Sequence, residues 1–392
     1  MHRMRSEGRG PSWSCVSILP VFHIGFRRAE RLDHLGPLPS RALPRAFAGD
    51  DNSVRWGFCV KRFLLIVVIL AAAIGGAWYW EQWNWQQPGP SPAYKVVMIE
   101  PGDHVAVIAQ HLAGAGVIAN ADLFRLGLRL RNLQGTLKAG EYGFPAHLGM
   151  AEVAGIVASG KSIQHKLTAA EGLTAKMIYD IVAADSVLKG DAGAVPDEGT
   201  LLPETYLFTR GTTRAQMLAR MAKARVDLLK KLWPARTDNL PYKTKQEAIT
   251  LASIVEKETA IPEERRHVAS VFVNRLRLGM KLQSDPTIIY DITKGYPLGR
   301  GIRESELLKP SPHNTYAIPG LPPTPICNPG KDSIAAVLDP IASNDLYFVA
   351  NGKGGHVFSA SVDEQNKNVA AWRRIEQFQK LNTPLPVPQL RK

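Results

Sequence analysis

The longest apolar stretch of the chain, Phe63 to Trp80, contains no charged residue and no proline. About 20 apolar residues can cross a bilayer as a helix, so this pattern predicts one membrane-spanning helix within residues 60–85. Tryptophan or tyrosine stands at positions 78, 79, 80, 83 and 85, which is typical of an interfacial aromatic belt. Lys61 and Arg62 directly precede the span, and the positive-inside rule then places the N-terminus in the cytoplasm and the bulk of the chain outside.

A cleaved signal peptide is the alternative interpretation of this stretch. Signal peptides end in a small-residue cleavage site, whereas bulky tryptophans follow here, so the pattern favours a permanent anchor. Residues 1–59 lack sustained periodicity and contain scattered prolines and arginines. We expect them to be disordered, or to be an extension created by a mis-assigned start, with translation beginning at Val60.

Beyond the span the pattern changes to short helices and strands. Residues 86–93 are rich in proline and glycine, which predicts a linker. Residues 94–164 predict a small α/β module with strands at 94–99 and 140–144 and helices at 105–113, 122–133 and 150–158. The first strand and its Pro101-Gly102-Asp103 turn resemble a LysM-like carbohydrate-binding module, and a plain scaffold domain is the alternative.

Residues 165–382 predict a larger domain, followed by a tail at 383–392. Its predicted helices are 175–184, 215–232, 245–258, 262–278 and 331–338, and its predicted strands are 164–167, 346–350 and 356–359. The expected fold class is therefore α+β: a single N-terminal transmembrane helix, the small LysM-like α/β module, and a mixed α/β domain that would carry the chemistry.

One predicted helix of the larger domain, Lys245–Glu258, places a carboxyl group on an apolar face. At about 100° per residue, Leu251 and Val255 fall on one side of the helix, and Glu258 lies at the centre of that side. Glu256 falls near its edge. The helical pattern therefore favours Glu258 over Glu256 as the carboxyl group that faces the interior.

Burial would change the acidity of Glu258. A carboxyl group in an apolar wall loses solvation when it ionises, so its pKa rises, as a general acid near neutral pH requires. The alternative is that Glu258 turns to solvent at a frayed helix end, or pairs with Arg265 or Arg266.

Several longer motifs follow one another in a fixed order: residues 251–259 (LASIVEKET), 268–276 (VASVFVNRL), 282–289 (LQSDPTII), 314–322 (NTYAIPGLP) and 347–358 (YFVANGKGGHVF). Together they resemble the YceG-like family of endolytic murein transglycosylases, over roughly residues 94–381. The sequence LPETY at 202–206 also fits a family motif. The resemblance implies a catalytic glutamate in the E-K-E-T motif, which matches Glu258, with Glu256 as the fallback.

The resemblance also implies a location and a substrate. It points to a single-pass protein of the bacterial inner membrane with its catalytic domain in the periplasm, acting on peptidoglycan glycan strands, with cell-wall synthases as candidate partners. A lytic transglycosylase needs one carboxyl group and no cofactor, because the C6 hydroxyl of the substrate is the nucleophile. A glycoside hydrolase normally uses two carboxyl groups.

Six polar residues in these motifs are candidates for contacting the sugars: Glu204, Tyr206, Gln283, Asp285, Asn314 and Tyr316. Each could instead serve turn or core hydrogen bonding, since buried polar groups need partners. Asp285 bears on the reaction type. At a hydrolase-like separation from Glu258 it would make the protein a hydrolytic muramidase, whereas a turn-capping role before Pro286 leaves transglycosylation. A non-catalytic, membrane-anchored glycan-binding scaffold is the third alternative.

The net charge of the chain limits the kinds of molecule that it is expected to bind. The formal net charge is +13, which suits an anionic lipid, an acidic polymer or a nucleic acid. The basic residues are scattered, without a basic stripe or zinc-finger spacing, so we expect no nucleic-acid binding.

Cys327 is the only cysteine after the span, and the sequence contains no CxxC or HExxH spacing. The exported part should therefore rely on neither a disulfide nor a protein-built metal site.

The start of the chain can be tested by mass. If translation begins at the Val60 codon, read as a GTG start, the initiator tRNA inserts methionine there. The intact mass and the N-terminal sequence of the native protein will then match a chain with methionine in place of Val60, followed by Lys61 and Arg62. Peptides from residues 1–50 in a digest of the native protein would contradict the shorter start.

Overall fold

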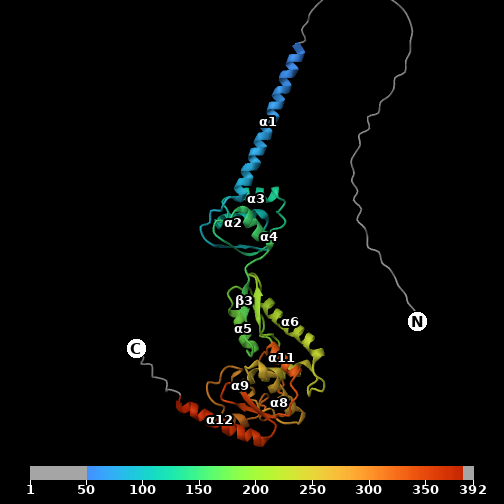
Figure 1. Ribbon diagram of the computed structural model, residues 1–392, viewed down its shortest axis with the longest axis vertical. Helices are drawn as coiled ribbons and strands as arrows, with labels where there is room; N and C mark the ends of the chain where they lie inside the picture. Colours follow the sequence, from blue (N-terminus) through green and yellow to red (C-terminus); the bar gives the residue numbers. More distant parts are fainter. Residues whose placement is uncertain (1–50, 383–392) are drawn as a thin grey trace, which may run out of the picture. The chain divides into compact units, whose positions relative to one another are not determined.

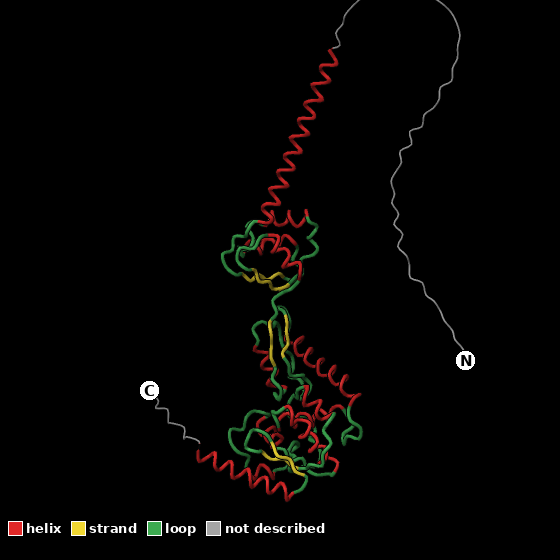
Figure 2. Tube along the Cα trace, in the orientation of Figure 1, coloured by secondary structure: helices red, strands yellow, loops and turns green. Residues whose placement is uncertain are grey.

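The computed structural model describes residues 51–382, with side chains from Val60 to Phe378 (Figures 1 and 2). The expectations for residues 1–50 and for the tail at 383–392 lie outside this range. The first element is the helix α1 (Asp51–Gln86), and its segment from Val60 to Gln86 is long and apolar enough to cross a membrane. At 1.5 Å per residue these 27 residues extend about 40 Å, more than the ~30 Å hydrocarbon core of a bilayer.

The small module after α1 has a strand–helix–helix–strand arrangement. Strand β1 (Lys95–Ile99) pairs antiparallel with β2 (Gly140–Phe144), with Val97 opposite Tyr142. Helices α2 (Val105–Gly114) and α3 (Ala121–Leu130) connect the strands, and α4 (Met150–Ser159) follows. The module has its own core, which includes Ile99, Leu112, Phe124, Leu128, Tyr142, Phe144 and Val153.

The predicted linker at 86–93 is attached to this module. The Gly89 amide donates to the His147 carbonyl over 3.2 Å, and the His147 amide donates to the Ser91 carbonyl over 2.8 Å. A Cβ at Gly89 would lie 2.2 Å from the carbonyl oxygen of Leu148, so only glycine permits this approach. Gly89 therefore permits close packing, and the segment is held to the module by hydrogen bonds.

The predicted domain at 165–382 contains two hydrophobic clusters. The first surrounds the antiparallel pair β3 (His165–Thr168) and β4 (Thr205–Phe208), with α5 (Ala175–Ala184) and α6 (Arg214–Leu232). Ile178, Val182, Leu201, Met217 and Met221 are the most deeply buried side chains of this cluster.

The second cluster is built around α7 (Lys245–Glu258), in which all eight residues from Ala248 to Val255 are buried. It is completed by α8 (Arg265–Arg277), α9 (Asp285–Thr293) and α11 (Lys331–Leu338), and by the antiparallel hairpin of β5 (Tyr347–Ala350) and β6 (His356–Ser359). The remaining elements are the 3-10 turns η1 (Trp233–Ala235) and η2 (Pro262–Glu264), and helices α10 (Glu304–Leu308) and α12 (Val362–Asn382).

Asn328 joins the two clusters through hydrogen bonds. It is fully buried, its Oδ1 accepts from the Leu201 amide over 2.9 Å, and its Nδ2 donates to the Leu173 carbonyl over 3.1 Å and to Glu198 Oε1 over 3.2 Å. The Asn328 backbone also pairs with this segment, since its amide donates to the Leu173 carbonyl over 2.9 Å and its carbonyl accepts from the Gly172 amide over 3.1 Å. The side chain of Asn328 therefore adds the link to the segment around Leu201.

Replacing Asn328 with alanine should destabilise the fold. The variant leaves several buried polar groups without a hydrogen-bond partner, so we expect the free energy of unfolding to fall by about 2–4 kcal/mol. Thermal unfolding of the detergent-solubilised protein would report this as a lower Tm. Asn344→Ala, at an exposed position, is the matched control and should change stability by less than ~0.5 kcal/mol. Equal Tm values for the two variants would contradict the linking role of Asn328.

Candidate active site

The carboxyl group of Glu258 closes the C-terminal end of α7. Glu258 is the last helical residue, and it lies three residues after Val255, where the buried run ends. The Ser284 hydroxyl donates to Glu258 Oε1 over 2.5 Å. Burial raises the pKa of Glu258 to about 7; the Ser284 bond lowers it, the charge of Asp285 raises it, and His356 and Arg275 lower it. A carboxyl group with this pKa can both donate and accept a proton near neutral pH.

Ser284 reaches Glu258 because the loop before α9 is tightly fixed. Gln283 adopts a left-handed backbone conformation with φ 52°, which is costly for a residue with a side chain. The Ser284 amide donates to Thr315 Oγ1 over 2.9 Å, and the hydroxyl groups of Thr287 and Thr315 lie 3.0 Å apart. Ser284, Thr287 and Thr315 are all buried. Their mutual hydrogen bonds hold the Ser284 hydroxyl in its orientation toward Glu258.

Arg275 fixes the other side of the same loop. Its guanidinium group is almost completely buried and donates to the Leu282 carbonyl over 2.7 Å and to the Leu346 carbonyl over 2.6 Å. It therefore ties the segment before Gln283 to the start of strand β5. Its positive charge also favours the ionised form of Glu258.

A second set of contacts fixes the chain just after Glu258. The Thr259 hydroxyl lies 3.4 Å from Glu264 Oε2 and accepts from the Ile261 amide over 3.1 Å. Glu264 also accepts from the backbone amide of His356 over 2.8 Å, and its Oε2 lies 2.7 Å from His356 Nδ1. The threonine of the E-K-E-T motif thus connects the end of α7 to the β5–β6 hairpin.

The two glutamates of the motif have different partners. Glu256 is also buried, which the helical pattern did not predict, but its Oε2 accepts from the Gly330 amide over 2.8 Å and its Oε1 lies 3.8 Å from Arg265 Nη2. It thereby holds the start of α11. The pairing with Arg265 that was the alternative for Glu258 belongs to Glu256.

Three of the six predicted sugar-contacting residues lie around Glu258. Asp285 is exposed at the start of α9, and Tyr316 donates to its Oδ1 over 2.7 Å. Burial, followed by the bond to Asp285, raises the pKa of Tyr316, so the hydroxyl group remains a donor. Gln283 is exposed beside Ser284. These three side chains stay candidates for binding substrate.

The other three are engaged elsewhere or lie in another part of the fold. Asn314 is fully buried, and its Nδ2 donates to three carbonyls at the end of α10, at 2.8 Å for Lys309, 2.9 Å for Leu307 and 3.3 Å for Glu306. Its Oδ1 accepts from the Tyr316 amide. Its amide shapes the loop that carries Tyr316. Tyr206 is buried in the β3–β4 cluster, where it donates to the Leu202 carbonyl over 2.8 Å, and Glu204 is exposed next to β4.

Ser284, Arg275, His356 and Glu264 were not among the predicted site residues. Ser284 stands between Gln283 and Asp285 in the sequence, and these polar neighbours are the sequence feature that could have identified it as a site residue. Arg275 interrupts an apolar run, which indicates a buried charge with partners. His356 becomes a neighbour of Glu258 only when the hairpin folds back on α8.

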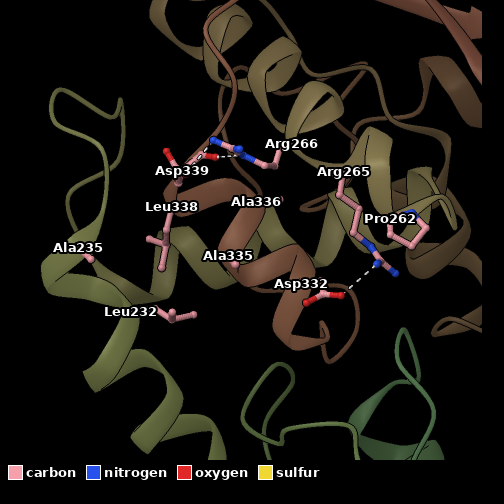
Figure 3. Close-up of a pocket in the computed structure, with 10 residues that line it drawn as sticks. All are labelled: Leu232, Ala235, Pro262, Arg265, Arg266, Asp332, Ala335, Ala336, Leu338 and Asp339. Carbon is pink, nitrogen blue, oxygen red and sulfur yellow. Dashed lines mark hydrogen bonds and ion pairs between the residues drawn. The ribbon is translucent and has the colours of Figure 1, made fainter.

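A pocket of about 450 Å³ lies elsewhere on this part of the protein and is drawn in Figure 3. Residues of η1, η2, α8 and α11 line it. Its arginines are paired with carboxylates: Arg266 Nη2 lies 2.8 Å from Asp339, and Arg265 Nη1 lies 3.6 Å from Asp332 (Figure 3). Neither Glu258 nor any of the six predicted sugar-contacting residues lines this pocket.

The comparison with known families agrees with the motifs. A model of the YceG-like family matches residues 97–371. The chain belongs to the YceG-like family. In this family context the segments that surround Glu258, from α7 to the β5–β6 hairpin, all fall within the matched range.

Two relatives with the name endolytic murein transglycosylase are similar to the chain. The protein of Streptococcus pneumoniae strain D39 is 28% identical over 365 residues, covering 79% of this chain and 65% of the relative. The protein of Bacillus subtilis strain 168 is 33% identical over 172 residues, covering 44% and 47% respectively. The chain thus spans less than two thirds of the length of these relatives. A crystal structure of a YceG-like protein from Listeria monocytogenes is 30% identical, covers 71% of this chain and 99% of its own, and has a TM-score of 0.44.

The pKa of Glu258 predicts a pH profile with opposite responses in two variants. If protonated Glu258 starts the reaction, activity should fall as pH rises through about 7. Ser284→Ala removes a bond that lowers this pKa, so the alkaline limb should move to higher pH by about one unit. Asp285→Asn removes a charge that raises the pKa, so the limb should move to lower pH.

The measurement is kcat/KM for glycan-strand cleavage against pH. The two variants are matched, because they alter neighbouring residues with contrary effects on one carboxyl group. Limbs that stay in place, or that both move in one direction, would show that another group sets the profile.

Proposed function

We propose that this protein is an endolytic lytic transglycosylase that cleaves the bond between MurNAc and GlcNAc in peptidoglycan glycan strands, with Glu258 as acid and base. One observation carries the proposal: a carboxyl group at the end of a buried helix has a pKa of about 7 and is oriented by Ser284. The names of the relatives from S. pneumoniae and B. subtilis support the same activity.

The chemistry requires two proton transfers at one group. Protonated Glu258 donates its proton to the glycosidic oxygen as the bond from that oxygen to MurNAc C1 breaks, and the GlcNAc side leaves with a hydroxyl group. The C6 hydroxyl of the same MurNAc then attacks C1, and the Glu258 carboxylate takes the hydroxyl proton. The product is a 1,6-anhydro-MurNAc end, and Glu258 returns to its protonated form. A pKa near 7 suits both transfers, because neither state of the carboxyl group is strongly disfavoured.

A hydrolytic muramidase is a second candidate, because Asp285 is close enough to raise the pKa of Glu258. In that reaction Asp285 would act as nucleophile or base. The hydrogen bond from Tyr316 to Asp285 favours a positioning role instead, since a donor on a carboxylate lowers its basicity.

The anchor and the small module fit the same proposal. An exposed apolar α1 would hold the enzyme at the inner membrane with its catalytic part in the periplasm, where new glycan strands emerge. The strand–helix–helix–strand module would act as a LysM-like unit that binds glycan. Cell-wall synthases would be the natural partners of an enzyme that sets strand length.

Incubation of the purified protein with sacculi tests the reaction type. We expect fragments with anhydro ends by mass spectrometry, and Glu258→Gln should reduce the rate by about 10²–10⁴-fold, the range that general acid–base catalysis contributes. Glu256→Gln is the matched control, because it removes a neighbouring carboxylate that binds the start of α11. That variant should retain most of the activity.

Each other result has a distinct meaning. Reducing ends in place of anhydro ends would identify a muramidase. No products from folded protein would favour a glycan-binding scaffold, and full activity of Glu258→Gln would overturn the assignment of the acid and base.

A further inference from the structure

The end of α1 is firmly joined to α3 of the small module. Trp85 is 5% exposed and stacks on Phe124 with ring centroids 5.7 Å apart, and the guanidinium carbon of Arg131 lies 4.3 Å from the centre of the Trp85 ring. Arg131 Nη1 also forms a 2.7 Å ion pair with Glu81, which is itself buried. A Cβ at Gly127 would lie 2.2 Å from the Trp85 ring, so glycine permits this contact.

This joint lies directly beside the aromatic belt of α1. Trp78, Tyr79, Trp80 and Trp83 are each at least 55% exposed, although exposed tryptophans are costly in water. Such residues concentrate at the level of the lipid headgroups. Glu81 and Trp85 are within one or two turns of them, so the part of α3 that they contact must lie close to that level.

The outer face of α3 has the composition of a membrane-surface helix. Leu126 is 43% exposed and Leu130 is 57% exposed, and they are one turn apart. Arg125 and Arg129, also one turn apart, are exposed on the adjoining part of the face, and Arg125 Nη1 lies 3.0 Å from Asp122 Oδ1 in an exposed ion pair that contributes little in water. The opposite side carries Phe124 and Leu128, which are fully buried in the module. Exposed leucines bordered by arginines are typical of helices that lie in the interface of an anionic bilayer.

We infer that α3 is an interfacial helix, which inserts Leu126 and Leu130 among the lipids next to α1 while Arg125 and Arg129 bind anionic phospholipid headgroups. The inference rests on the proposed role of α1 as a membrane anchor. Two features support a lipid occupant over a protein: the face continues directly from the exposed aromatic belt, and its charge is complementary to anionic lipid. The module would then lie on the bilayer surface and would not extend away from it on a tether.

Lipid-quenching fluorescence of the full chain tests this inference. Leu130→Cys would carry an environment-sensitive nitrobenzoxadiazole label in a chain with Cys15 and Cys59 replaced by serine. Cys327 can stay, because it is buried and burial raises the pKa of its thiol well above the usual range, so it should not react. The protein is reconstituted into vesicles of phosphatidylcholine and phosphatidylglycerol, with and without lipids that carry a nitroxide near the headgroup.

We expect the label at position 130 to be quenched by roughly half or more, as for a group at the depth of an interfacial helix. The same label at Val226, which is exposed on α6, is the control and should be unaffected. Arg125→Gln with Arg129→Gln should weaken quenching at position 130, and omission of phosphatidylglycerol should do the same.

A third label, at Ile74 in α1, distinguishes a failure of this inference from a failure of the proposed membrane anchor. Quenching at position 74 but not at position 130 would overturn the interfacial role of α3 and leave the anchor intact. An unquenched label at position 74 would overturn the anchor. A label at position 130 that is shielded from water yet unquenched would show that a protein, such as a second copy of the chain, covers α3 instead of lipid, and would also overturn the inference.

Discussion

Desolvation of one carboxyl group is the constraint around which the hydrophobic cluster that contains α7 is arranged. Eight consecutive buried residues bring α7 through the centre of its cluster, and Glu258 stands where that burial ends. An ionised carboxylate is costly there, and a neutral one would lack the basicity that a second proton transfer needs. The Ser284 hydroxyl and the nearby positive charges offset part of the cost, which leaves the pKa near 7. Both protonation states are therefore accessible.

Most of the polar residues in the motifs maintain this arrangement and are not free to contact a substrate. Arg275 holds the loop before Ser284, Thr259 connects the end of α7 to Glu264, and Asn314 fixes the loop that presents Tyr316. Irregular segments lack the backbone hydrogen bonds of helices and strands, and these side chains supply hydrogen bonds in their place. Under the proposed function, the groups left to contact a glycan strand are Glu258, Asp285, Tyr316 and Gln283. This division explains how so irregular a set of loops can position one carboxyl group.

Side-chain contacts also fix the junction between α1 and the small module, near the N-terminal end of the described residues. A tryptophan, an arginine and a buried glutamate attach α1 to α3, and a glycine allows the two helices to meet. The predicted linker is likewise bound to the module by backbone hydrogen bonds. Motion at the bilayer surface would therefore be transmitted to the module from its first residues. Glycine, which suggests flexibility in a sequence, permits close packing at both places.

The sequence by itself determined most of the local elements and singled out Glu258 as the candidate acid. Periodicity and caps predicted helices at 175–184, 245–258 and 331–338 and the strand at 140–144 with the bounds that the structure has, because these depend on neighbouring residues. It missed β4, α9, α10 and α12, and it could not tell that the Glu256 side chain is largely buried. Only the tertiary structure decided which polar residues face Glu258. Ser284, Arg275 and His356 come from segments that are distant in sequence, and whether Asn314 contacts a sugar or three carbonyls depends on the packing of its loop. A side chain's available hydrogen-bonding capacity is set by its neighbours in space, and sequence patterns describe only its neighbours along the chain.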